Sequence, residues 1–295
     1  MPQRSVTVQV PATSANLGPG FDCLGVALDW TARVRVTASD EPQPRPAGPI
    51  EQMVVGAALA LYGRALAPNP AGIAVEYQSD IPVGRGLGVS AIARVAGLLA
   101  AARLIGGEFE AESLLPLAFQ LERHGDNVVP AMFGGIQVVV GDDDRVAHVR
   151  VEPPADLRLV LLIPELSMPT DETRKRLPEQ FSRNQAVHNI GRAAMLVAAL
   201  SQRRYDLLHI ATEDVLHQPA RGTIFKPMYP IFQAARDAGA LGVFLSGGGP
   251  TIAAFATERF EDIAGAMREI AAAHGVASTS RVCALSGAGA VLVEE

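Results

Sequence analysis

The spacing of apolar positions predicts a chain in which strands and helices are interleaved. Apolar and polar residues alternate over residues 6–10 and 26–37, which is the period of a strand with one buried face. Residues 11–20, rich in Pro, Gly and Asn, and residues 40–49, with four prolines, predict loops. Alanine- and leucine-rich runs predict helices at residues 52–65, 90–105 and 112–123, and further strands are expected at residues 73–77 and 134–140.

The second half of the chain repeats this mixture without regular spacing. Strands are expected at residues 157–163, 243–245 and 252–255 and around residues 282 and 291. Helices are expected from about residues 171 and 184 and at residues 230–238 and 260–274. The Pro153-Pro154 pair suggests a boundary between a lobe of residues 1–152 and a lobe of residues 153–295. Since a regular β-α-β repeat is missing, we expect an α+β fold with two lobes.

Composition and charge narrow the function classes. The 295 residues are 48% apolar and carry a net charge of −6, so the chain is globular and lacks the basic surface of a nucleic-acid binder. Only Lys175 and Lys226 are lysines, which argues against a lysine-dependent phosphate loop. Two cysteines form no disulfide framework, and no apolar run could cross a bilayer, so we expect a cytoplasmic protein without a membrane partner.

A glycine-rich segment at residues 81–91 is the first candidate for chemistry. Glycines at alternate positions can turn backbone N–H groups into one concavity, and the helix that follows adds its positive dipole end. The segment is neither a Walker loop nor a dinucleotide fingerprint, because it lacks a Gly-Lys-Ser/Thr ending and the last glycine of G-x-G-x-x-G. These residues alone fit two interpretations, a site that binds an anion and a turn that binds no ligand.

Four further groups carry polar residues that suit a binding site. Residues 11–22 gather Thr, Ser, Asn and Asp in one segment, and residues 245–251 hold three consecutive glycines. Residues 122–127 place Glu122, His124 and a second carboxylate at a helix end, where Glu122 and Ser90 could offer oxygen ligands to magnesium. Arg174 and Arg221 could clamp a carboxylate. Each group can also be interpreted without a ligand, as a turn, a hairpin loop, a helix end or a pair of solvated surface arginines.

Taken together, these segments resemble the motifs of the small-molecule kinase superfamily that includes galactokinase, homoserine kinase and mevalonate kinase. The match covers about residues 6 to 293, and the amino-acid sequences of the motifs are typical of the homoserine kinase branch. The segments that carry it are P-A-T-S-A-N-L-G-P-G-F-D at 11–22, the glycine loop, E-R-H-G-D-N-V-V-P-A-M-F-G-G at 122–135, P-T-D-E-T-R-K-R-L-P at 169–178, H-Q-P-A-R at 217–221 and L-S-G-G-G-P-T at 245–251.

The resemblance implies a fold and an activity. It implies an N-terminal lobe like ribosomal protein S5, a C-terminal ferredoxin-like lobe, and a homodimer. It also implies ATP-dependent phosphorylation of the L-homoserine hydroxyl to O-phospho-L-homoserine, on the path to threonine. ATP would bind at Pro82, Val83, Gly84, Arg85, Gly86, Leu87, Gly88, Val89, Ser90, Ala91 and Ile92, and Mg²⁺ at Ser90 and Glu122. Homoserine would bind at Asn16, Asp22, His124, Asn127, Thr170, Arg174 and Arg221, with Asp22, Asn16 and Arg174 in the catalytic roles. We expect Asp22 to orient the hydroxyl rather than to act as a base, because a carboxylate near pKa 4 is a weak acceptor for an alcohol proton.

Three positions depart from the motifs that the family usually shows. Val89 replaces the first serine of G-L-G-S-S, Gly248 replaces an alanine, and Gln52 replaces an asparagine near the adenine. Two alternatives therefore stay beside the main prediction. One is a kinase of the same superfamily acting on mevalonate or a sugar, and the other is a catalytically weakened ligand-binding relative.

Overall fold

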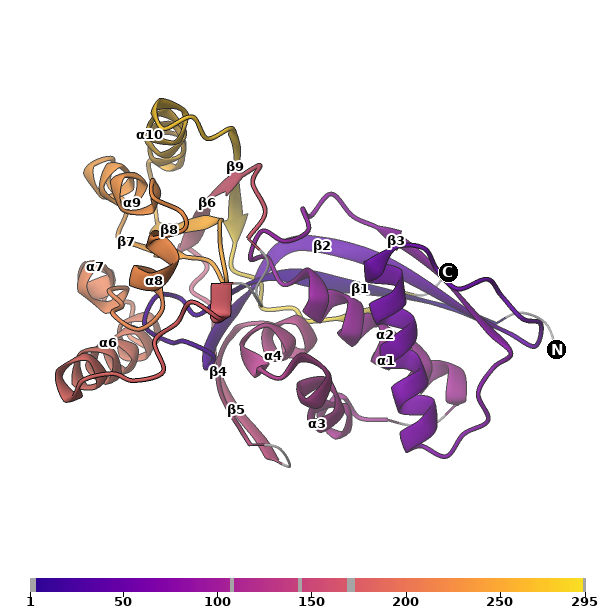
Figure 1. Ribbon diagram of the computed structural model, residues 1–295. Helices are drawn as coiled ribbons and strands as arrows, with labels where there is room; N and C mark the ends of the chain where they lie inside the picture. The colour runs from indigo at the N-terminus through magenta and orange to yellow at the C-terminus, as the bar shows by residue number, and fades with distance from the viewer. Residues whose placement is uncertain (1–3, 107–108, 143–144, 169–172, 294–295) are drawn as a thin grey trace.

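The computed structural model describes residues 4–106, 109–142, 145–168 and 173–293, which form two lobes, each built on one sheet (Figure 1). Every strand pair described is antiparallel. The first sheet has the order β10-β1-β2-β4-β5, with β3 paired to β2. Its strands are β1 Arg4–Ala15, β2 Leu24–Ser39, β3 Gly72–Gln78, β4 Ile136–Asp142, β5 Arg145–Val151 and β10 Val291–Val293.

Four helices pack against this first sheet on the face seen in Figure 1. They are α1 Pro49–Arg64, α2 Val89–Ile105, α3 Ala111–Glu122 and α4 Gly125–Phe133. Helix α2 packs against β1 and β2 and is flanked by α1, α3 and α4, and most of its residues are buried. This explains why its sequence is apolar on nearly every side instead of amphipathic.

The second sheet has the order β7-β8-β6-β9 and is built like a ferredoxin fold. Its strands are β6 Arg158–Pro164, β7 Gly242–Leu245, β8 Ile252–Ala256 and β9 Ser278–Ala284. The helical segments of this lobe are α6 Arg183–Ser201, the 3₁₀ turn η1 Tyr205–Leu207, α7 Leu208–Ala211, α8 Gln218–Gly222, α9 Met228–Asp237 and α10 Phe260–Ala273.

Both faces of the second sheet are buried, and strand β6 shows how. Val160 and Leu162 join a core formed with α9 and α10, whereas Leu159 and Leu161 join the larger core that continues into the first lobe. A strand buried on both faces needs apolar residues at successive positions, and β6 reads R-L-V-L-L-I-P. The two lobes therefore share one continuous apolar core, which fixes the cleft between them.

Most predicted elements are confirmed, with shifted ends. The predicted loop from residue 11 is wrong in its first part, because β1 continues to Ala15; the pairing with β2 shifts register between Pro11 and Thr13. Such a shift accommodates a proline, which has no N–H for the ladder. Elements α4, β5, η1, α7 and α8 were not predicted. The helix expected from about residue 171 begins outside the described residues.

The last strand connects the end of the chain to the first sheet. Strand β10 pairs with β1, although the chain has just left the second sheet at β9. The division at residues 152/153 stays a prediction. No helix in the described ranges has the length and apolar character needed to cross a bilayer.

Candidate active site

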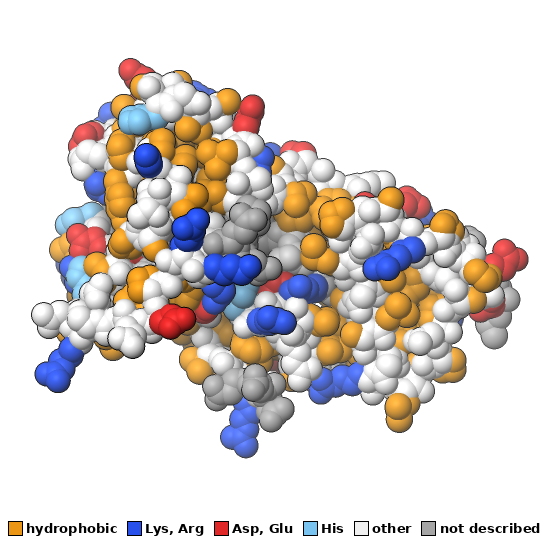
Figure 2. All heavy atoms as spheres, viewed as in Figure 1, with side chains coloured by type: hydrophobic (Ala, Val, Ile, Leu, Met, Phe, Trp, Pro, Cys, Tyr) orange, Lys and Arg blue, Asp and Glu red, His pale blue; other side chains and the backbone are white. Residues whose placement is uncertain are grey.

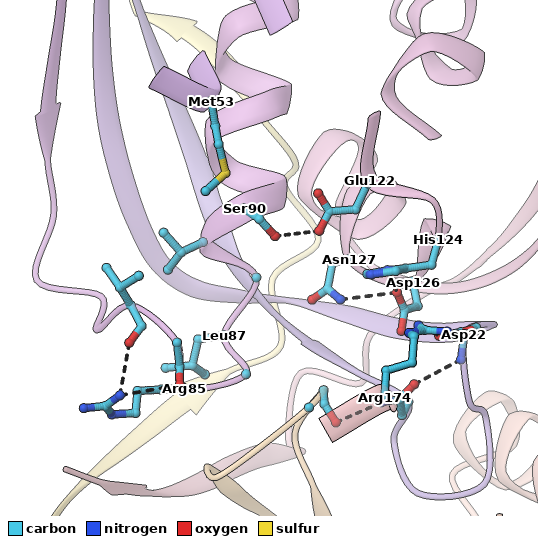
Figure 3. Close-up of a pocket in the computed structure, with 18 of the residues that line it drawn as sticks. Asp22, Met53, Arg85, Leu87, Ser90, Glu122, His124, Asp126, Asn127 and Arg174 are labelled. Carbon is cyan, nitrogen blue, oxygen red and sulfur yellow. Dashed lines mark hydrogen bonds and ion pairs between the residues drawn. The ribbon is translucent and has the colours of Figure 1, made fainter. Parts of the chain in front are cut away.

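Three glycine-rich segments, far apart in sequence, meet at one cavity between the lobes (Figure 3). The first spans the end of β1 and the turn after it, the second leads into α2, and the third joins β7 to β8. On the face shown in Figure 2, several Lys and Arg side chains lie along the junction of the lobes, around the mouth of this region. The cavity thus combines glycine-rich backbone with a positive rim.

The second segment has the backbone of an anion-binding loop. Gly84, Gly86 and Gly88 have φ of 69°, 74° and 72°, values in the left-handed region that favours glycine. Gly88 is the N-cap of α2 and no side chain caps that helix, so its first N–H groups are available to a ligand. The sequence-based prediction of a concave loop at a helix start is confirmed.

The three segments are hydrogen-bonded to one another. The Ser246 hydroxyl donates to the Gly86 carbonyl at 2.7 Å and lies 2.8 Å from the Ser14 hydroxyl. The Thr13 N–H donates to the Leu87 carbonyl, and the Asn16 amide donates to the Gly247 carbonyl at 2.9 Å. These bonds hold the glycine loop against the second lobe and fix its shape in advance of any ligand.

Ser90 and Glu122 meet at the start of α2. The Ser90 hydroxyl donates to Glu122 Oε1 at 2.5 Å, and Arg94, one turn further along α2, forms an ion pair with Glu122 Oε2. Burial raises the pKa of Glu122, and the neighbouring Arg94 opposes that rise. The pair of oxygen atoms that was predicted for magnesium is therefore assembled, with an arginine that holds its carboxylate in place.

His124, Asp126 and Asn127 form a second polar group in the same cavity. His124 Nδ1 lies 2.7 Å from Asp126 Oδ1, and Asn127 accepts a hydrogen bond from the Thr13 hydroxyl at 2.8 Å. Burial alone would lower the pKa of His124, but the hydrogen bond to Asp126 and the nearby carboxylates outweigh it and raise that pKa. The Asp126 carboxylate thus stabilises the charged form of His124 relative to burial alone.

Asp22 and Arg174 form a bidentate ion pair across the cavity. The two bonds measure 2.6 and 2.8 Å, and the side chains are 33% and 38% exposed. The Asp22 N–H donates to Asn16 Oδ1, so the two residues of the first segment support each other. Three residues predicted to bind homoserine, Asn16, Asp22 and Arg174, are therefore adjacent, and Asp22 and Arg174 form an ion pair with each other.

Arg221 lies beneath this pair and is almost fully buried. It donates to His217 Nδ1 at 2.6 Å and to the Gly247 carbonyl at 3.0 Å. Because His217 Nε2 faces the Gly18 carbonyl, which can only accept, His217 is the neutral tautomer with its proton on Nε2. Burial lowers the pKa of Arg221 to about 10, with a further contribution from Arg174.

One aromatic ring lies close to both arginines. The guanidinium carbons of Arg174 and Arg221 lie 5.1 and 5.5 Å from the centre of the Phe21 ring, which also stacks on His217. Cations are attracted to such a ring face. Two like charges are thereby held near each other, with Asp22 as the carboxylate paired to one of them.

The cavity contains most of the predicted site residues. It is lined by Asn16, Asp22, all residues from Val83 to Ser90, Glu122, His124, Asn127, Arg174 and Arg221. Ala91 and Ile92 lie in the core, Pro82 lines a neighbouring hollow, and Thr170 is outside the described residues. Gln52 lies away from this cavity, where its side-chain amide donates to the Pro46 carbonyl.

Sequence reasoning missed several residues of the cavity. Ile50 and Met53 line it, and Arg94 contacts Glu122. Asp126, the second carboxylate of the 122–127 segment, also lines the cavity but was given no role. Arg94 follows Ser90 by four positions, so it had a readable signal. Ile50 and Met53 had none, because the alanine-rich helix gives no indication of which residues face a ligand.

Comparisons with known proteins agree with this geometry. The model of the GHMP kinase N-terminal domain matches residues 52–135, and that of the GHMP kinase C-terminal region matches residues 195–277. The chain therefore belongs to the GHMP kinase family. The single-residue departures at Val89, Gly248 and Gln52 do not remove it from the family.

Several homoserine kinases are similar to this chain over most of its length. The homoserine kinase of Deinococcus radiodurans is 40% identical over 269 residues, which cover 88% of this chain and 86% of that protein. The homoserine kinase of Moorella thermoacetica is 38% identical, with 97% and 99% covered. The crystal structure of homoserine kinase from Cytophaga hutchinsonii superposes with a TM-score of 0.87 at 32% identity, covering 98% of this chain and 97% of that one. A mevalonate kinase structure, at 13% identity and a TM-score of 0.68, shares the fold alone.

Proposed function

We propose that this chain transfers the terminal phosphoryl group of ATP to the side-chain hydroxyl of L-homoserine, giving O-phospho-L-homoserine. The observation that carries the proposal is a carboxylate, Asp22, and two arginines, Arg174 and Arg221, gathered beside the glycine loop. An amino acid has an ammonium and a carboxylate group, and these residues have the opposite charges. Full-length similarity to homoserine kinases supports the same acceptor.

The glycine loop is the proposed site for the phosphates of ATP. Its left-handed glycines and the uncapped start of α2 present N–H groups to an anion, and no lysine is needed. Ile50 and Met53 supply an apolar wall beside the loop for the purine ring. Val89 replaces a serine without affecting these backbone donors.

Mg²⁺ fits the oxygen atoms of Ser90 and Glu122. Mg²⁺ prefers hard oxygen ligands and is commonly bound by one or two carboxylates together with substrate phosphates. Glu122 Oε1 and the Ser90 hydroxyl are such a pair, at the helix start where the phosphates would lie. When bound, the ion would neutralise charge on the transferring phosphoryl group.

The remaining residues would position the acceptor. Arg174 and Arg221 would bind the homoserine carboxylate, while Asp22 and Asn16 would hold its ammonium group and orient the hydroxyl. His124 would face the acceptor from the same cavity, and Asn127 would donate to the hydroxyl oxygen. Phosphoryl transfer depends mainly on such positioning and charge neutralisation. Thr170 and the homodimer stay predictions from the resemblance, and the cytoplasmic location stays a prediction from the composition.

A comparison of acceptors tests this function. ADP release with Mg-ATP is measured with L-homoserine, mevalonate, L-serine and no acceptor. We expect turnover with homoserine well above the other three. Turnover with mevalonate instead would favour the other branch of the superfamily, and silence with all acceptors would favour a weakened ligand-binding relative.

Variants of the magnesium ligands form a second test. Ser90→Ala should raise the Mg²⁺ concentration needed for half-maximal turnover, because it removes one of the two oxygen ligands. Ser113→Ala, which changes a hydroxyl at the start of α3, is the matched control and should leave that concentration unchanged. Equal magnesium dependence in both variants would contradict the assignment of Ser90.

A further inference from the structure

The ion pair between Asp22 and Arg174 occupies the place proposed for the acceptor. Both residues line the cavity, and both of their charged groups are bonded to each other instead of being open to a ligand. A charged ligand that uses either residue must therefore replace one half of this pair. The pair is bidentate, which is the strongest arrangement for arginine and a carboxylate.

The surroundings keep the pair in one geometry. Asp22 has φ of 60°, and its N–H is held by Asn16 Oδ1. Asn16 is itself fixed, because its side-chain amide donates to the Gly247 carbonyl, which also accepts from Arg221. The Asp22 carboxylate is thus placed by the first and third glycine segments, and Arg174 reaches it from the second lobe.

Opening the pair from one side leaves an uncompensated charge. A ligand with only a carboxylate would take Arg174 and leave Asp22 without its cation. A ligand with only an ammonium would take Asp22 and leave the positive charge of Arg174 near that of Arg221, since both lie close to the Phe21 ring. Loss of one partner from an ion pair is costly where solvent is partly excluded, and both side chains here are about two-thirds buried.

On these grounds, and resting on the proposed function, we infer that the Asp22–Arg174 ion pair is a charge lock that only a zwitterionic acceptor opens. The ligand ammonium replaces Arg174 at Asp22, and the ligand carboxylate replaces Asp22 at Arg174, so both charges stay paired. The pair thereby selects amino-acid alcohols against hydroxy acids and amino alcohols of the same length. This selection comes from the ion pair that is present before a ligand binds, in addition to the contacts made with the bound acceptor.

If the ion pair acts as this lock, a variant without it should bind ligands that carry only one charged group more tightly than wild type does. In wild type, 4-hydroxybutanoate, which lacks the ammonium, and 3-amino-1-propanol, which lacks the carboxylate, should each bind at least about 100-fold more weakly than L-homoserine. In Asp22→Asn, Arg174 no longer has to leave an anion, so 4-hydroxybutanoate should bind about 10-fold more tightly than it binds wild type. In Arg174→Met, 3-amino-1-propanol should likewise gain about 10-fold, and homoserine should lose affinity in both variants.

Calorimetric titration of the full-length chain with the three ligands tests this inference without any turnover. Arg176→Met, the same substitution two positions along on an exposed side chain, is the matched control and should change none of the affinities. Circular dichroism first establishes that each variant is folded, and either of the two variants alone can decide the question. A higher affinity of Asp22→Asn for 4-hydroxybutanoate, or of Arg174→Met for 3-amino-1-propanol, supports the lock.

Two results would overturn the inference, and they differ in what else they affect. If wild type phosphorylates homoserine but neither variant gains affinity for its one-charge ligand, the lock is wrong and the proposed function stands. If wild type neither binds nor phosphorylates homoserine, the proposed function and the lock both fail.

Discussion

Gly86 is the position where a single methyl group should separate the phosphate loop from the second lobe. It has φ of 74°, and a Cβ there would lie 2.1 Å from the Ser246 carbonyl oxygen. Gly106, at the end of α2, has a similar φ of 82° but meets nothing within 4 Å. Gly86→Ala and Gly106→Ala therefore share the backbone strain and differ in the contact.

The structure gives the size of that difference. A left-handed conformation costs a non-glycine residue about 1–2 kcal/mol, which both variants should lose. To reach the 3.4 Å of ordinary contact, the two loops at Gly86 must separate by about 1.3 Å. This movement breaks the hydrogen bond from Ser246 to the Gly86 carbonyl, so Gly86→Ala should lose about 1 kcal/mol more.

Urea unfolding and ATP kinetics measure the two consequences. We expect Gly106→Ala to be destabilised with unchanged kinetics, and Gly86→Ala to be destabilised further with kcat/KM for ATP lowered by about 100-fold, since a displacement near 1 Å misplaces the reacting groups. If Gly86→Ala unfolds at the same urea concentration as Gly106→Ala and keeps wild-type kinetics, the reasoning from the close contact is refuted.

Two other predictions concern buried charge. Arg94→Met should cost about 2 kcal/mol at pH 8, because it leaves the buried Glu122 carboxylate without its ion pair, while Arg103→Met, exposed on the same helix, should cost little. Because burial already raises the pKa of Glu122 and Arg94 opposes it, the loss in Arg94→Met should shrink as the pH falls and Glu122 takes up a proton; a pH-independent loss would contradict this. Burial lowers the pKa of His217 to about 4 from its ordinary 6.5, so the unfolded chain binds the extra proton first and wild-type stability should fall as the pH drops from 6.5 towards 4. His217→Gln should show a shallower fall by up to about 1.4 kcal/mol per pH unit in urea unfolding, with the exposed His209→Gln as control; identical slopes in the two variants would show that His217 is not the group involved.

Local patterns in the sequence predicted most elements because their residues carry the signal themselves. The glycine loop at residues 81–91 and the alanine-rich α2 are examples, since alternate glycines and helical composition are local properties. Helix α4 was missed because it has nine residues, contains Pro130 and begins three positions after α3 ends. Strand β5 was not predicted, although residues 145–151 contain a partial alternation.

Contacts between distant segments could not be predicted from spacing. Ser14 and Ser246 are 232 positions apart, and Asp22 and Arg174 are 152 apart, so only the folded chain brings them together. The motif resemblance placed Asp22 and Arg174 in one site as separate ligand contacts. Their bond to each other depends on side-chain geometry, which no sequence pattern contains.

Phosphorus NMR of the reaction product tests the proposed function most directly. Purified chain is incubated with Mg-ATP and L-homoserine, and the phosphorus spectrum is recorded with and without proton decoupling. We predict a new phosphate monoester signal, split by the methylene protons next to the homoserine oxygen and growing in step with ADP. A spectrum in which only inorganic phosphate accompanies ADP would mean that water, and not homoserine, accepts the phosphoryl group, and would contradict the account.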